Sequence, residues 1–341
     1  MAPRCCLSFL RAGSERCRPG QPYLTPARCL LRDLGPRAGP SARHRPTAAF
    51  WVALEQNGPW GERAATQSHL DPGVGLALDR MCRDAGGRFI LIRRPGTHSD
   101  PQISDSHKGR PQRVYVAGGL ALGPWLLQDS LDDPARLLQL PWAALGEGDI
   151  AALQNAVPQL QRSGSPVLLV CANSRRDACC AVRGRPVALE SSLQRPGRVW
   201  ECSHTGGHRF APTGVLLPHG QTFARLSSES AIAALDASTR DEIPAELLGE
   251  ECDRGRSHLS PAAMAAESIV RQQIQEPSLL ALSTRAVQHP GRENAWKCRV
   301  SHLDGRHWDV VVAHTSGGED RPESCGKAPV PTWRWSVLSG L

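Results

Sequence analysis

The chain has 341 residues, of which 40% are hydrophobic, 21% are charged and 5% are aromatic. This length predicts two or three folded units, and 28 prolines and 32 glycines among balanced charges exclude a collagen, a coiled coil or a largely disordered chain. The net charge of +7 arises from residues 1–46, where nine arginines face two acidic residues, so the remainder is neutral. A neutral folded part argues against nucleic-acid binding.

Residues 1–46 are predicted to be an unstructured basic extension. Their longest apolar run, residues 5–10, is interrupted by Ser8 and is too short for a secretory signal. No stretch approaches the roughly 18 apolar residues that cross a membrane. We therefore expect a cytoplasmic protein without a membrane span, whose 12 cysteines are thiols, metal ligands or redox groups rather than disulfides.

Apolar runs and their spacing predict an N-terminal α/β lobe over residues 47–163. A polar, turn-rich loop separates a strand, helix, strand unit from a pair of strands and a final helix. The expected elements are strand 51–56, helix 70–85, strand 88–93, strands 114–117 and 125–128, and helix 147–162.

A second α/β unit is predicted over residues 164–257. Its expected elements are strand 166–170, loop 172–180, a helix from about residue 186 to 193, strand 199–202, a glycine-rich loop, a hairpin of 215–217 with 222–226, and helix 228–237. This β, α, β, loop, β, β, α order is that of a thioredoxin-like α/β sandwich, whose loops gather at the carboxyl ends of the strands. The sequence also admits the interpretation that the first lobe is a diverged second copy of this fold.

Residues 258–341 are predicted to form a small C-terminal α+β module. Ser260 and Pro261 have the chemistry of a helix cap and first turn, and the helix body follows over 262–275. Strands over 299–303 and 306–313 flank Asp304-Gly305, a strong hairpin signal.

Cysteine and histidine pairs follow neighbouring strands of the second unit. Cys171 and Cys180 flank one loop, and His204-Thr-Gly-Gly-His208 fills the next. Because the sandwich brings separate loops together at one edge of its sheet, these residues can supply four metal ligands. The two glycines between the histidines favour a tight loop over a helix, and such a loop lets backbone amides approach an inorganic cluster.

Residues 171–180, residues 204–211 and Pro218-His-Gly220 together resemble the sucrase/ferredoxin-like family, and residues 51–71 resemble its N-terminal part. The resemblance implies a thioredoxin-like ferredoxin with a [2Fe-2S] cluster. The cluster ligands that it implies are Cys171, Cys180, His204 and His208. It implies an electron carrier or redox sensor, served by a separate electron-donor reductase and an acceptor protein, rather than an enzyme. No carboxylate pair supports the "sucrase" part of the family's label.

Three alternatives stay open from the residues alone. Cys179 competes with Cys180 as the second ligand, although the Arg-Asp-x-x-Cys pattern favours Cys180. Zinc also accepts two cysteines and two histidines, which would make the protein a zinc-stabilised interaction protein, but the spacing from Cys171 to Cys180 exceeds that of zinc fingers. A thiol-disulfide oxidoreductase using Cys179 and Cys180 is the third, and the chain lacks the Cys-x-x-Cys of such enzymes.

Mixed ligation has a predictable electronic effect. Two neutral imidazoles in place of thiolates make the cluster less negative and so raise its reduction potential. The remote nitrogen of a ligating imidazole can also gain a proton when the iron is reduced. The sequence therefore predicts proton-coupled one-electron transfer.

Overall fold

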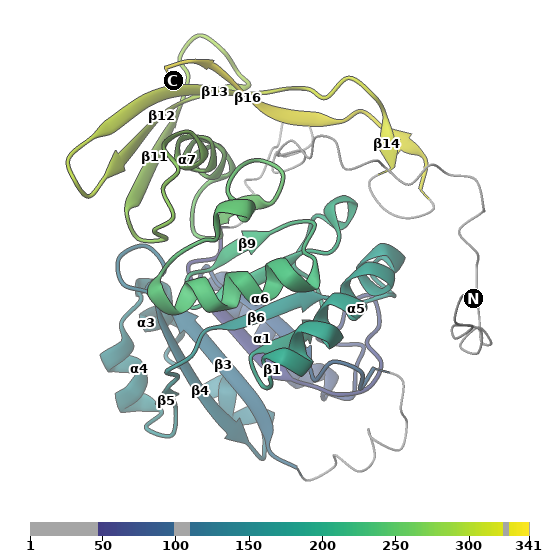
Figure 1. Cartoon of the computed structure of the whole chain (residues 1–341). Coiled ribbons are helices and arrows are strands. Elements are labelled where there is room, and N and C mark those ends of the chain that lie inside the picture. Colours follow the sequence, from purple (N-terminus) through teal and green to yellow (C-terminus); the bar gives the residue numbers. More distant parts are fainter. Residues whose placement is uncertain (1–46, 99–109, 323–326, 341) are drawn as a thin grey trace.

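The computed structural model describes residues 47–98, 110–322 and 327–340. Within them the chain forms a ten-stranded mixed sheet, a four-stranded antiparallel sheet and a two-stranded ribbon, with helices packed on the two larger sheets (Figure 1). The predicted α/β class is confirmed. The predicted basic extension, residues 1–46, lies outside the described residues.

The ten-stranded sheet has two halves with one strand order. The first contains β1 (Trp51–Glu55), α1 (Pro72–Asp84), β2 (Arg88–Arg93), β3 (Gln112–Gly118) and β4 (Trp125–Leu131). The second contains β6 (Val167–Cys171), α5 (Ala178–Gln194), β7 (Val199–Cys202), β8 (Gly214–Leu217), β9 (Gln221–Phe223) and α6 (Ser228–Ala237). β1 pairs parallel with β2 and antiparallel with β3, as β6 does with β7 and β8. The halves are thus a topological repeat.

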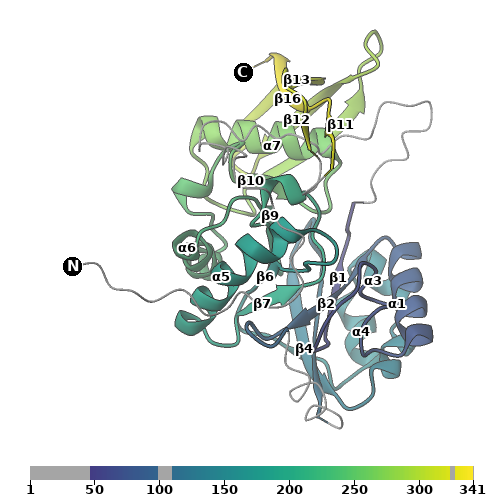
Figure 2. The same cartoon turned by 90° about the vertical axis from the view of Figure 1, so that its right-hand side faces the viewer.

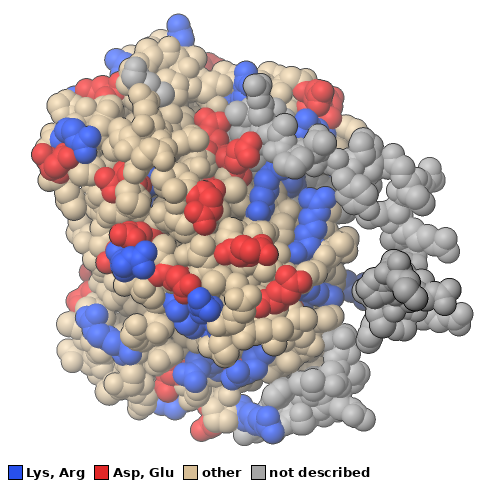
Figure 3. All heavy atoms as spheres, viewed as in Figure 1, with Lys and Arg blue, Asp and Glu red and all other residues tan. Residues whose placement is uncertain are grey.

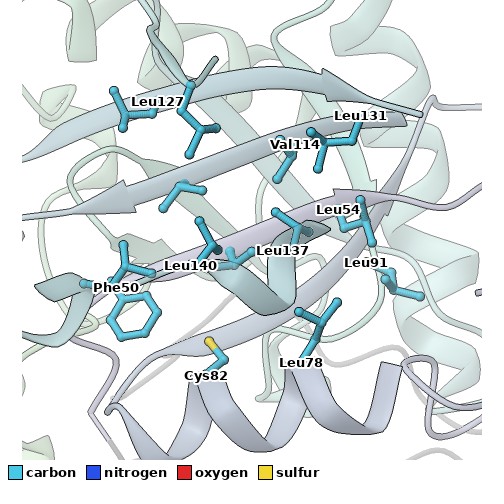
Figure 4. Close-up of a cluster of buried hydrophobic side chains, with 14 of the residues drawn as sticks. Phe50, Leu54, Leu78, Cys82, Leu91, Val114, Leu127, Leu131, Leu137 and Leu140 are labelled. Atoms are coloured by element: carbon cyan, nitrogen blue, oxygen red, sulfur yellow. The ribbon is translucent and has the colours of Figure 1, made fainter. Parts of the chain in front are cut away.

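The two halves meet at β2 and β7, which pair antiparallel through Ile92 with Cys202 and Arg93 with Glu201. α1 covers one face of the first half, where Leu78 and Cys82 point at the strands (Figure 4). α5 and α6 cover one face of the second half. The opposite faces of the two halves pack on each other and form a third hydrophobic core. The strands therefore lie between α1 on one side and α5 and α6 on the other (Figure 2).

The end of the first half differs from its prediction. Instead of one helix over residues 147–162, the chain forms η1 (Pro134–Gln139), α3 (Trp142–Glu147), α4 (Ile150–Ala156) and the edge strand β5 (Gln161–Arg162). Gly148, with φ of 78°, ends α3, and the side chain of Asp149 caps α4 by accepting from the Ala152 N–H at 3.0 Å. The spacing of apolar residues alone predicts one continuous helix. A glycine with left-handed backbone ends the first helix and the aspartate after it caps the second, so two helices form.

Helix α5 begins earlier than predicted. The sequence suggested a loop over residues 172–180 and a helix from Pro186, yet Pro186 lies inside α5. The Asp177 side chain caps the helix by accepting from the Cys179 N–H at 2.8 Å. Pro186 is exposed, so water can reach the carbonyl that its missing N–H leaves unbonded. Cys179 and Cys180 therefore belong to the first turn of a helix.

A helix and an antiparallel sheet follow the second half. The elements are η3 (Ser238–Arg240), η4 (Ala245–Leu247), β10 (Asp253–Arg256), α7 (Pro261–Ile274), β11 (Leu282–Gln288), β12 (Ala295–His302), β13 (His307–Ser316), β14 (Arg321–Pro322), β15 (Pro329–Val330) and β16 (Trp333–Ser339). The predicted cap at Ser260 and the hairpin at Asp304-Gly305 are confirmed. β10 extends the large sheet, and buried Arg256 joins it to Glu267 of α7 at 2.7 Å.

Charges of both signs are interspersed on the face viewed in Figure 3. No helix among the described ranges is both long and apolar enough to span a membrane.

Candidate metal centre

Cys171 ends the fully buried strand β6, and its side chain belongs to the core shared by the two halves. Helix α5 approaches the end of this strand closely because it carries Gly184 there. A Cβ on Gly184 would lie 2.2 Å from the carbonyl oxygen of Cys171. The absence of a side chain at Gly184 thus lets the second turn of α5 pack directly on the end of β6.

The first turn of α5 carries Cys180 back toward Cys171. Cys180 is buried, whereas Cys179 is half-buried. The Cys180 N–H donates to the Asp177 carbonyl at 3.2 Å, and the Asp177 side chain caps the same turn. The start of a helix favours a thiolate, since the peptide dipoles present their positive ends there. Of the two adjacent cysteines, the fold therefore brings Cys180 to Cys171.

His204 stands in the loop that follows β7. Gly206 and Gly207 have φ of 91° and 73°, a left-handed backbone that glycine adopts without strain. The predicted preference for a tight loop is thereby confirmed. Residue 208 opens a short 3-10 turn, η2 (His208–Phe210), and the side chain of His208 lies outside what the structure describes.

The thiols of Cys171 and Cys180 share a hydrogen bond. This bond, helped by the nearby His204 side chain and the Thr205 N–H, holds the pKa of Cys171 well below its ordinary value. The same bond, together with burial, raises the pKa of Cys180. Metal ligation needs both thiols deprotonated, so a cation bound at this point would displace protons from the pair.

Two further residues lie at this site: Cys202, which the sequence favours as a buried apolar residue over a substitute ligand, and Arg88, to which the sequence assigns no role. Cys202 ends β7 directly opposite Cys171 and is buried in the same core, where burial raises the pKa of its thiol. Arg88 of the first half donates to the carbonyls of His204 and Thr205, at 3.2 Å each. The available signal for Arg88 was its place as the charged first residue of a strand whose next four residues are apolar.

Three of the four predicted ligand residues, Cys171, Cys180 and His204, are therefore brought together. In the described part of the chain no group of three or more His, Cys, Asp or Glu side chains is spaced to hold a metal ion as it stands. Cys180 is a free thiol and so is not joined to Cys179. The assignment of these residues as ligands stays a prediction.

Comparison with known proteins places this geometry in a family. Residues 79–248, about half of the chain, match the sucrase/ferredoxin-like family. The chain belongs to this family. The match covers β2 to η4 and includes the loop and helix turn of the candidate centre, while residues 51–71 lie outside it. Neither a curated protein nor a solved structure matches the chain.

Proposed function

We propose that this member of the sucrase/ferredoxin-like family is an electron carrier or redox sensor that binds one [2Fe-2S] cluster. The ligands in this proposal are Cys171, Cys180, His204 and His208. The observation that carries it is the convergence of three of these residues, since the buried Cys171 thiol lies against the Cys180 thiol and the His204 side chain. Such a cluster supplies one-electron transfer, at a potential that imidazole ligands raise.

The chain's own residues suit the group in three respects. The Cys171 and Cys180 thiols are buried, which keeps water from the sulfur atoms. The Thr205 N–H is directed at the Cys171 sulfur, and amide bonds to sulfur stabilise additional negative charge. Arg88 donates to the carbonyls of His204 and Thr205, so the imidazole stands on a restrained backbone.

Proton coupling belongs to the proposal through the histidines. A ligating imidazole is neutral, and its remote nitrogen can take a proton when electron density rises at the bound nitrogen. If one proton accompanies each electron, the midpoint potential should fall by about 59 mV per pH unit. A potential that does not change with pH would remove proton coupling and leave the carrier role intact.

The partners and the location are proposals of the same kind. Electrons would come from a separate reductase and pass to an acceptor protein. Six cysteines in the described ranges are free thiols, whereas Cys179 is disulfide-bonded, contrary to the expectation that the cysteines form no disulfides. We propose a cytoplasmic location on the basis of the sequence, and the Cys179 disulfide does not support it. Fractionation of cells that produce the protein tests the location.

Anaerobic purification tests the cofactor. We expect a coloured protein with about two irons and two sulfides per chain. Cys180→Ala and His204→Ala should lose the colour and the iron, whereas Cys179→Ala should keep both. Cys82→Ala, which removes a buried cysteine from α1 of the other half, is the matched control. A colourless protein with one zinc would overturn the electron-transfer proposal and make the site a structural clip.

A further inference from the structure

A pocket lies in the first half, at the carboxyl end of β1. It measures about 150 Å³ and is partly open to solvent. Gln56 lines it just after β1, Gln112 at the start of β3, Asp71 at the start of α1 and Asp133 at the start of η1. The candidate metal centre occupies the equivalent place in the second half, at the end of β6 and the start of α5. Ligands of α/β sheets bind outside the carboxyl ends of strands, yet the proposed cluster gives this pocket no role.

Two glutamine side chains meet at the pocket. Leu54 and Val114 belong to the core under α1 (Figure 4), and continuing their β1–β3 register places Gln56 opposite Gln112. Gln56 is only 7% exposed, and its Oε1 accepts no hydrogen bond from any residue that the structure describes. The Oε1 of Gln112 is also buried and is unpartnered within the same ranges. Buried acceptors are costly unless they receive a donor, so both oxygens call for one.

The orientation of the Gln56 amide follows from its other contact. Its Nε2 donates to the Asn57 carbonyl at 3.4 Å. Exchanging the amide nitrogen and oxygen would set two carbonyl oxygens against each other. The nitrogen is therefore held by the backbone, and Oε1 is the atom that Gln56 offers to the pocket.

Asp71 and Asp133 give the pocket a negative charge. Each caps a helix with one oxygen, Asp71 by accepting from the Val74 N–H and Asp133 from the Ala135 N–H, at 2.9 Å in both cases. The second oxygen of each carboxylate stays available for a ligand. The two helix starts carry partial positive charges, which two full carboxylate charges exceed. No lysine or arginine is found among the described residues that line the pocket, so it attracts a cation.

We propose that this pocket binds a small primary alkylammonium ion. Its three N–H donors match the amide oxygens of Gln56 and Gln112 and one carboxylate. Its alkyl chain packs against Leu70, Val74 and Pro134, which also line the pocket. This apolar wall favours an organic cation over a calcium ion, which takes six to eight oxygen ligands. The inference concerns the first half alone and does not depend on the cluster.

Calorimetric titration of the full chain with propylamine, at pH 8 and constant ionic strength, tests the site. An alkylamine carries its positive charge at this pH, as a lysine side chain does. We expect saturable binding of one propylammonium per chain. Trimethylpropylammonium, which has the same charge and no N–H donor, should not bind, and neither should propionate, which has the opposite charge.

Three variants separate the contributions. Gln112→Leu, at a half-buried position, should weaken propylammonium binding about tenfold, since a hydrogen bond to a charged group is lost. Asp133→Asn keeps a capping side chain but removes a charge, and should weaken binding about threefold. Asp149→Asn makes the same change at the cap of α4, outside the pocket lining, and is the matched control that should bind like the unchanged chain.

Circular dichroism and urea midpoints establish that each variant is folded, and the two Asp→Asn variants remain decisive if Gln112→Leu does not fold. Absence of saturable propylammonium binding, or equal binding of trimethylpropylammonium, would overturn the proposal. Equal affinities of Asp133→Asn and Asp149→Asn would do the same, as would calcium that binds one per chain and displaces propylammonium. None of these results depends on iron content, so failure of the cluster proposal leaves the test valid.

Discussion

At the carboxyl end of β6 the chain places Cys171, whereas the equivalent end of β1 carries Glu55. The strands neighbouring these ends carry Cys202 and Ile92 in the same register, and these two residues pair with each other where the halves meet. The two halves share one topology, yet they carry different side chains at the equivalent strand ends. Fold fixes where a site can form, and the residues at strand ends decide whether it does.

The helices that follow these strands extend the comparison. Asp71 caps α1 and Asp177 caps α5, so both helices begin alike. Three residues after the cap stands Val74 in one half and Cys180 in the other. The Glu55 side chain instead accepts a hydrogen bond from the Arg113 backbone N–H at 3.1 Å, so this carboxylate is bonded to the backbone of the first half. The first half therefore supplies structural contacts, and the second carries the residues that we propose as ligands.

The largest effect is expected where the halves are joined. Arg93 and Glu201 form a buried ion pair at 2.8 Å, and the Arg93 guanidinium also lies 3.8 Å from the Trp60 ring centroid. Arg93→Met leaves Glu201 buried without its partner and should lower the free energy of unfolding by about 3–5 kcal/mol. Urea denaturation measures this loss.

The double variant Arg93→Met, Glu201→Leu removes both charges and should recover most of the lost stability, because no charge is then buried alone. A loss below about 1 kcal/mol in Arg93→Met would show that the pair does not hold the halves together.

A smaller effect should distinguish the two helices. Gly184→Ala places a methyl group against the Cys171 carbonyl, and Gly75→Ala does the same at 1.7 Å from the Ala65 carbonyl. Each should cost about 3 kcal/mol of unfolding free energy, since backbone cannot easily move aside. Only Gly184→Ala should also lose iron, because it shifts the turn that holds Cys180.

Gly164→Ala, where a Cβ meets nothing within 4 Å, is the control for both helix variants. Iron content is measured beside urea denaturation. Equal iron in Gly184→Ala and Gly75→Ala would contradict the assignment of structural contacts to the first half and of the proposed ligands to the second.

The smallest effect should appear with acid, on the side of the second half that faces α7. Burial and Arg256 lower the pKa of His258 from 6.5 to about 4. As the pH falls, His258 is protonated in the unfolded state before it is protonated in the folded state. The contribution of the neutral His258 to folding stability is therefore complete above pH 6.5 and is lost as the pH falls toward 4. Between about pH 7 and pH 5 the contribution should fall by about 2 kcal/mol.

His258→Gln should flatten this part of the stability curve, measured as urea midpoints at both pH values. If the variant kept the full acid sensitivity of the unchanged chain, another group would be responsible.

Local signals predicted the elements that local chemistry determines. Residues 88–93 and 228–237 were predicted with the bounds that the structure has, because a continuous apolar run and a serine cap specify them. The start of α5 was missed because proline usually opens a helix, and here exposure lets it stand inside one.

The centre was predictable in part for the same reason. Cys171, Cys180 and His204 follow strands of one unit, so topology alone placed them together. Arg88 and Arg254 meet the same loop from 116 residues and about 50 residues away in sequence, through pairings that no spacing announces. Such long-range contacts, between the halves for Arg88 and within the second half for Arg254, depend on how the sheet closes, which local patterns do not encode.

The contacts of Arg88 and Asn173 bear on which part of the chain is self-sufficient. Residues 164–257 contain every proposed ligand, yet the His204 carbonyl accepts from Arg88 and the Asn173 side chain donates to the Gly61 carbonyl at 3.0 Å. A fragment cut at residue 164 would carry the reactive groups without the wall that restrains them. We therefore expect that both halves together form the smallest fragment that keeps the proposed ligands and the contacts that restrain them.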